Sequence, residues 1–183
     1  TRVVEGSSPG EVVIVGGGNS AGQAAMFLSR HVADCRLLIR GDDLGKSMSR
    51  YLVDQIERND AVVVCRNSEV VELGGERELE TATVADTRSG KRTRVSAKAL
   101  FVFIGASPHT EWLDGQLATD DAGFLLTGRD VQGDDLAAYD GDRPLFLETS
   151  RPGMFAAGDV HAGSVKRVAS AVGEGSMAIR LVH

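Results

Sequence analysis

The first hundred residues alternate short apolar runs with stretches of helical periodicity. Residues 11–15, 36–40 and 61–65 are aliphatic runs, each of the length of one strand. Between them, residues 19–32 and 44–59 repeat apolar positions at the spacing of an amphipathic helix. Strands that alternate with helices are joined by right-handed crossovers, so this order predicts a Rossmann-like parallel sheet of the α/β class.

The pattern changes after residue 68. Residues 69–73, 79–87 and 92–96 favour short strands that are joined by glycine-containing turns. This predicts an antiparallel β-meander with one face in water. Residues 99–104 return to an apolar run, which predicts a further buried strand. We therefore expect the first domain to end at about residue 105.

The remaining residues, 106–183, are patterned less regularly. The acidic stretch 134–142 predicts a loop, residues 154–157 predict a buried strand, and residues 164–182 predict a last helix. No apolar run approaches the roughly 18 residues that a membrane-spanning helix needs, so we expect no membrane span.

Composition and charge narrow the class of protein. The 22 glycines among 183 residues make up about 12%, against a usual value near 7%, which indicates many tight turns. The net charge of −6 does not favour binding to nucleic acid or to an anionic membrane. Cys35 and Cys65 lie in apolar runs, which favours buried packing residues in a reducing cytoplasm. A thiol catalyst that uses either cysteine is a weaker hypothesis, and we predict no metal site.

A dinucleotide-binding motif follows the first predicted strand. Residues 16–21 fit G-x-G-x-x-A and open the first predicted helix. Gly16 permits the sharp turn, Gly18 lets backbone amides approach a pyrophosphate, and Ala21 keeps the helix close to the sheet. The amides of Asn19 and Ser20 would face the phosphates at the positive end of the helix dipole. The alternative is a purely structural turn.

The end of the second strand bears on the choice between NAD and NADP. An NAD site usually presents an acid there, whereas this chain has Arg40, which can pair with a 2′-phosphate. Lys46 and Arg50 follow and could add positive charge, while Asp42 and Asp43 would oppose a phosphate. NADP is favoured, NAD stays open, and the alternative for all three cations is an ordinary surface role.

Several segments together resemble the low-molecular-weight thioredoxin reductases and their flavoprotein relatives. Residues 16–21 look like that family's glycine motif, and residues 101–108 look like the strand that returns to the FAD domain. Residues 149–160, which contain Gly158-Asp159, look like the flavin motif. Residues 166–168 and Gly173-x-Gly175 follow at the family's spacing. The resemblance covers nearly the whole chain.

This resemblance implies a pyridine nucleotide-disulfide oxidoreductase that passes hydride from NAD(P)H to FAD and on to a disulfide or other acceptor. It implies that residues 9–105 are the NAD(P)H-binding domain and that residues 106–183 are the C-terminal half of a second, Rossmann-like FAD-binding domain. It also implies that the parent protein is a homodimer and that its partner is a thioredoxin-like or other redox acceptor.

The same resemblance assigns residues to the cofactors. Asp159, after Gly158, would bind the ribityl chain of FAD, and the helix start at Lys166, Arg167 and Val168 would face the pyrimidine end of the flavin. The full expected cofactor-binding set is Gly16, Gly18, Asn19, Ser20, Ala21, Arg40, Lys46, Arg50, Ile104, Gly105, Gly158, Asp159, Lys166, Arg167 and Val168. No residue is assigned as catalytic.

The chain also departs from the family pattern. The family's His-Arg-Arg-Asp stretch is replaced by residues 40–43, and no Cys-x-x-Cys pair is present, although its second cysteine is expected near Arg2. An isolated NAD(P)(H)-binding or sensing fragment, without its own flavin or turnover, is therefore the alternative function. We expect His161 to be a loop residue without a role, with contact to a cofactor as the alternative. We expect Trp112 to pack in a core or an interface.

Overall fold

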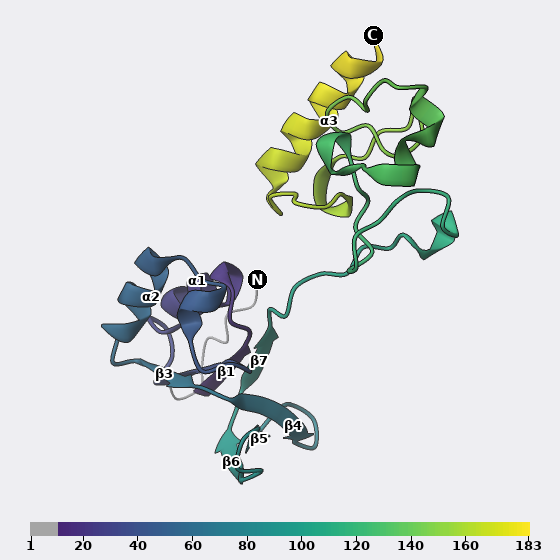
Figure 1. The fold of residues 1–183 in the computed structure, drawn as a ribbon. Helices are drawn as coiled ribbons and strands as arrows, with labels where there is room; N and C mark the ends of the chain where they lie inside the picture. Colours follow the sequence, from purple (N-terminus) through teal and green to yellow (C-terminus); the bar gives the residue numbers. More distant parts are fainter. Residues whose placement is uncertain (1–10) are drawn as a thin grey trace. The chain divides into compact units, whose positions relative to one another are not determined.

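The computed structural model describes residues 11–183, which form two compact units. The first unit ends at Gly105 and the second runs from Ala106 to His183 (Figure 1). Residues 9 and 10, the expected start of the first domain, and the position near Arg2 lie outside the described residues.

The first unit is built on a parallel sheet. Its strand order is β3-β2-β1-β7, with every neighbouring pair parallel. The predicted α/β class is therefore confirmed. The strands are β1 (Glu11–Val15), β2 (Asp34–Leu38), β3 (Val62–Cys65) and β7 (Ala99–Val102), and the connecting helices are α1 (Asn19–Leu28) and α2 (Arg50–Glu57).

The apolar side chains of the central strand are buried on both faces of this sheet. Val12 and Ile14 pack into the cluster that α1 and α2 cover. Val13, which points to the other face, packs with Leu38 and Ala82. Burial on both faces explains why β1 reads as a continuous apolar run instead of an alternating one.

A three-stranded antiparallel sheet supplies the cover for that second face. It consists of β4 (Ser68–Gly74), β5 (Thr81–Asp86) and β6 (Arg92–Ser96), in the order β4-β5-β6. Figure 1 shows it on the side of the parallel sheet opposite α1 and α2. The predicted β-meander is confirmed.

Several predictions in the first unit were wrong in part. The first helix, expected over residues 19–32, ends at Leu28, and the second strand, expected over residues 36–40, is Asp34–Leu38. The predicted helix over residues 44–59 is split into a 3-10 helix, η1 (Leu44–Lys46), and α2. Ser49 is extended because its amide donates to Asn19 Oδ1 at 2.8 Å instead of continuing a helix. The last strand ends at Val102, and Phe101 and Val102 are 37% and 54% exposed because β7 is an edge strand.

The second unit contains turns, 3-10 helices and one α-helix. Leu113, Leu117, Leu125 and Ala156 form its apolar cluster. None of the residues of its α-helix is buried. The elements are the 3-10 helices η2 (Glu111–Leu113), η3 (Gly128–Asp130), η4 (Gly133–Tyr139) and η5 (Gly158–Val160), followed by α3 (Val168–Val182).

Several predictions for this unit are corrected. The strand expected over residues 154–157 is reduced to a single bridge between Phe155 and Glu148, because no neighbouring segment continues the ladder. The acidic stretch contains η4 instead of an irregular loop, and the last helix begins at Val168, since Arg167 is still extended. Trp112 is 77% exposed, so packing in a core is wrong. Within residues 11–183, no helix is both long and apolar enough to cross a membrane.

Candidate functional site

The glycine turn after β1 is seated between the ends of its two neighbouring strands. Gly16 has φ +142°, and its amide donates to Leu38 O at 3.0 Å. A Cβ at Gly16 would lie 2.2 Å from Phe103 O, so any other residue would clash with backbone. Because β1 lies between β2 and β7, this turn occupies the point where the strand order reverses, where open α/β sheets bind ligands.

The first turn of α1 presents unpaired backbone donors at this turn. Gly18 is the N-cap, no side chain caps the helix, and its first turn contains no acid. Among residues 11–183, the amides of Gly18, Asn19 and Ser20 have no acceptor. Three free N–H groups at the positive end of a helix dipole form a binding site for an anion.

Packing holds α1 against the sheet and against α2. Ala21 is fully buried, as its place in the motif predicts. Gly22, which the motif does not include, is equally important: a Cβ there would lie 2.6 Å from Leu52 Cδ2 and 2.8 Å from Met48 Sδ. Its signal in the sequence is a second small residue directly after Ala21, at the crossing of two helices.

The three cations that were expected beside the glycine turn have different surroundings. Arg40 is exposed and lies two residues after the end of β2. Lys46 Nζ lies 3.0 Å from Asp42 Oδ1, in the loop that follows Arg40. Arg50 instead pairs with Asp54 of its own helix at 2.8 Å. Lys46 is thus paired with an acid of the loop that follows Arg40, whereas Arg50 is paired within α2.

Asp42 carries a full negative charge in this loop. The hydrogen bond from Lys46, a backbone hydrogen bond and the charges of Lys46 and Arg88 lower the pKa of its carboxyl. Asp43 is also occupied, because its Oδ1 accepts the amide of Gly45 at 2.8 Å and caps η1. Neither carboxylate is therefore free of protein partners.

The expected flavin motif places its acid on the surface of the second unit. Asp159 lies in η5 and is exposed, and among the described residues its carboxylate has no hydrogen-bonding or ionic partner. Lys166 Nζ lies 3.4 Å from Asp159 O and 4.0 Å from the centre of the Phe124 ring. A surface carboxylate without a protein partner can accept hydroxyl groups of a ligand.

The start of α3 resembles the start of α1 in its hydrogen bonding. Arg167 is the N-cap, with no side-chain cap, and the amides of Val168, Ala169 and Ser170 have no acceptor among the described residues. Lys166 and Arg167 add two positive charges beside these donors. This end of the helix can therefore stabilise negative charge on a ligand.

A pair formed by buried His161 and half-buried Glu174 packs against the flavin motif, and the sequence alone did not indicate it. His161 Nδ1 lies 2.7 Å from Ala162 O, and its Nε2 lies 3.1 Å from Glu174 Oε2. The same Oε2 accepts the amide of Gly158 at 2.6 Å. His161 is buried, so the expected loop histidine without a role is corrected.

The hydrogen-bond partners orient the ring of His161. A carbonyl oxygen only accepts, so Nδ1 of His161 must donate to Ala162 O. Nε2 of the same ring contacts Glu174 Oε2, the oxygen that also accepts the amide of Gly158. His161 and Glu174 therefore join α3 to the Gly158-Asp159 turn.

Ile104 and Gly105 lie at the end of the first unit, just after β7. Ile104 is 69% exposed, and Gly105 has φ +96° with open space around it. They follow Phe103, whose carbonyl contacts Gly16, so they leave the sheet beside the glycine turn.

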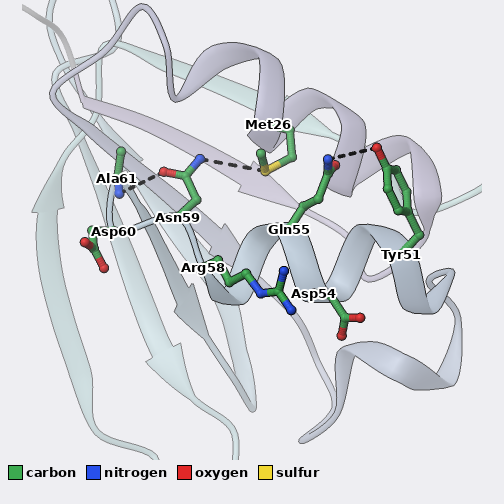
Figure 2. A pocket seen from close by; sticks show the side chains of 8 residues that line it. All are labelled: Met26, Tyr51, Asp54, Gln55, Arg58, Asn59, Asp60 and Ala61. Atoms are coloured by element: carbon green, nitrogen blue, oxygen red, sulfur yellow. Dashed lines mark hydrogen bonds between the residues drawn. The ribbon is translucent and has the colours of Figure 1, made fainter.

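Two hollows in the surface lie apart from the predicted residues. Figure 2 shows one that is lined by residues of α2 and of the turn after it, among them Tyr51, Gln55 and Asn59, and by Met26 of α1. None of the expected cofactor-binding residues lines it. The other, in the second unit, contains His161 and Glu174 but neither Asp159 nor Lys166.

The cysteines do not form a reactive pair. Both are free, and Cys35 is fully buried. Burial and the nearby charge of Asp34 raise the pKa of the Cys35 thiol to about 11, and burial also raises the pKa of Cys65. A nucleophilic thiol needs a lowered pKa, so the structure speaks against the thiol-catalyst hypothesis.

Comparison with known proteins gives a consistent picture. A family model described as pyridine nucleotide-disulphide oxidoreductase matches residues 1–175. The thioredoxin reductase of Streptomyces clavuligerus is 32% identical over 168 residues, which are 92% of this chain and 47% of that protein.

Two solved structures share the fold. The thioredoxin reductase of Lactococcus lactis superimposes with a TM-score of 0.73 at 22% identity, over 96% of this chain and 54% of that one. That of T. acidophilum gives 0.72 at 25% identity, over 94% and 51%. The chain thus spans about half the length of the relatives that it matches.

Proposed function

Because the chain belongs to the pyridine nucleotide-disulphide oxidoreductase family, we propose that it is the nucleotide-binding part, with a share of the flavin site, of an FAD-dependent oxidoreductase. The observation that carries this proposal is the row of unpaired amides at Gly18, Asn19 and Ser20 beside the turn after β1. When bound, a nicotinamide nucleotide would supply hydride and FAD would accept it, for delivery to a disulfide or another acceptor.

The first unit supplies the residues for the nicotinamide nucleotide. Gly16 and Ala21 fix the turn and the helix, while Gly18, Asn19 and Ser20 hold the pyrophosphate through their amides. Arg40 and Lys46 would bind the ribose phosphate of NADP, with Arg50 at a greater remove because Asp54 holds it. Ile104 and Gly105, the last residues of this unit, would contact the nucleotide beside the glycine turn.

The second unit supplies residues for FAD. The unpartnered carboxylate of Asp159 fits the hydroxyl groups of the ribityl chain, and the free amides at the start of α3 fit the end of a flavin that becomes negative on reduction. Gly158, Lys166, Arg167 and Val168 complete this set. Residues 106–183 would then be the C-terminal half of the FAD-binding domain, and the chain up to Gly105 the NAD(P)H-binding domain.

The electron acceptor is proposed from the names of the relatives. Several are thioredoxin reductases, so we expect the parent protein to act on a thioredoxin-like or similar redox partner. We also propose a homodimer in the cytoplasm, where two unpaired cysteines are in keeping with a reducing compartment.

A charge placed at Gly18 tests the proposal without disturbing the fold. A Cβ at Gly18 would meet only Ser47 O at 3.9 Å, and Asp and Asn are both favoured N-caps. Gly18→Asp would repel a pyrophosphate, so we expect it to weaken NADPH binding by tenfold or more relative to Gly18→Asn, the uncharged control of the same shape. Isothermal titration with NADPH measures this, and equal affinities of the two variants would contradict the proposal.

The alternative function is an isolated NAD(P)(H)-binding or sensing fragment without its own flavin. The observation in its favour is that α3, the helix after the flavin motif, buries none of its residues, so one face of α3 has no cover among the described residues. Absorbance of the purified chain decides between them. A colourless chain that NADPH protects against heat supports the alternative, and a yellow chain whose flavin bleaches with NADPH under anaerobic conditions excludes it.

A further inference from the structure

A single carboxylate joins the loop after β2 to the antiparallel sheet. Asp42 uses one oxygen for Lys46 Nζ, at 3.0 Å, and the other for Arg88 Nη2, at 3.1 Å. Arg88 lies in the turn between β5 and β6, 46 residues further along the chain. The sequence places Arg88 only among the charges of a hairpin tip, far from the glycine motif.

Backbone hydrogen bonds fix this turn against the loop. The amide of Asn67 donates to Gly41 O at 2.8 Å, and the amide of Thr87 donates to Asn67 O at 2.7 Å. Thr87 Oγ1 also donates to Asn67 O, at 3.1 Å. Arg88 therefore reaches Asp42 from a backbone that is tied to Gly41, the residue directly after Arg40.

This loop lies beside the glycine turn. The amide of Gly16 bonds to Leu38 O, and a Cβ at Gly17 would lie 3.7 Å from Ile39 Cγ2. The residues that follow Ile39 are thus next to the segment that would hold a dinucleotide. In Rossmann-like folds, the end of the second strand is where the adenosine ribose is recognised.

The acids in this corner are all engaged by protein donors, while the cations are not saturated. Arg40, Lys46 and Arg88 carry three positive charges, and the acids beside them are Asp42, Asp43 and Asp86. Both oxygens of Asp42 face cations, and Asp43 caps η1. The remaining acid, Asp86, is turned to its own hairpin, where Oδ1 accepts from the amide and the hydroxyl of Ser89 and from the amide of Arg88.

The cations retain donors for a ligand. A guanidinium has five N–H groups, and the contact with Asp42 uses one of those of Arg88. The Arg88 side chain is 66% exposed, so the others reach solvent. An exposed ion pair contributes little to the free energy of folding. The contact of Arg88 with Asp42 therefore adds little to the stability of the protein.

We propose that Arg88 is a specificity-determining residue, which binds the 2′-phosphate of NADPH together with Arg40 and Lys46, while Asp42 holds Arg88 and Lys46 in place. This inference rests on the proposed function, and it assigns to the antiparallel sheet a part in recognising the nucleotide. NADH lacks the 2′-phosphate, so Arg88 contributes to the affinity for NADPH and not for NADH.

The test compares Arg88→Ala with Arg92→Ala in the 183-residue chain. Arg92 is an exposed arginine of β6 whose side chain has no hydrogen-bonding or ionic partner among the described residues, so its loss changes the net charge equally. We expect Arg88→Ala to weaken NADPH binding about tenfold, the usual scale of one charge-assisted contact. NADH binding should change less than about twofold, and Arg92→Ala should leave the ratio of the two affinities unchanged. Arg88→Lys should retain part of the preference.

Each other outcome separates the inference from the proposed function. If the unmodified chain prefers NADPH and both alanine variants behave alike, the role of Arg88 is wrong while nucleotide binding stands. If the unmodified chain binds NADH as tightly as NADPH, the phosphate subsite is wrong. If it binds neither nucleotide, the proposed function itself fails.

Discussion

The two units of the chain are held together by different kinds of interaction. The first buries apolar side chains on both faces of a parallel sheet, from Val12 and Ile14 on one face to Val13 on the other. The second has a cluster of four apolar residues and a helix without a buried side chain. The expected nucleotide residues therefore stand on a large apolar core, whereas the expected flavin residues stand on a smaller one.

Polar contacts supplement apolar packing in the second unit, where Val131 and Leu147 are also fully buried. Glu148, 7% exposed, accepts the amides of Leu145 and Gly153 at 2.8 and 2.7 Å. The hydroxyl of Tyr139 donates to Thr149 O at 2.7 Å. Satisfied buried hydrogen bonds specify one conformation but add modest net stability, so this unit should open more readily than the first.

The largest expected effect comes from a cavity in the first unit. Leu37→Ala removes a fully buried side chain from β2 and should lower the free energy of unfolding by about 2–5 kcal/mol. Leu125→Ala, in the small cluster of the second unit, should cost less because fewer neighbours surround it. Residue-resolved amide hydrogen exchange measures both, and an equal or reversed order would refute the contrast.

An intermediate effect is expected at the pair of His161 and Glu174 that packs against the flavin motif. Glu174→Ala leaves Gly158 N–H without its acceptor and His161 Nε2 without its polar partner, which should destabilise the second unit by about 1–3 kcal/mol. Glu174→Gln keeps an oxygen for the Gly158 amide and should retain much of this stability. Hydrogen exchange at residues 158–161 is the readout. If the alanine variant matches the unmodified chain, the pair does not hold the turn.

The smallest effect is expected on the uncovered helix. Val172 of α3 is 64% exposed, so Val172→Lys should change the free energy of unfolding by no more than about 0.5 kcal/mol. The matched change Val53→Lys, at a residue of α2 that is 4% exposed, buries a charge and should be strongly destabilising. Thermal unfolding compares them, and a large loss from Val172→Lys would show that this face of α3 is covered.

The same contrast explains which elements could be predicted from the sequence. Strands such as residues 11–15 and 92–96 have strong local patterns, and the structure has both with the expected bounds. The segment 154–157 has the composition of a strand, but a strand also needs a neighbour, which one bridge to Glu148 does not supply. Likewise, the break at Ser49 depends on Asn19, which is 30 residues away.

The parts of the candidate site that lie within one short segment could be predicted from the sequence. The parts that depend on contacts between distant segments could not. The motif from Gly16 to Ala21 lies in one turn, so its spacing alone indicates the free amides at α1. The link from Arg88 to Asp42 and the contact of Glu174 with His161 join segments that are distant in sequence. No spacing rule for a single sequence encodes such contacts.

The buried thiol of Cys35 has a practical consequence. It lies in the central sheet of the first unit with no exposed surface, and thiol reagents attack only an accessible thiolate. Cys65, which is partly exposed, offers a second thiol at the end of the neighbouring strand β3. The rate at which a thiol reagent labels Cys65 therefore reports exposure at the surface. The rate at which it labels Cys35 reports opening of the sheet.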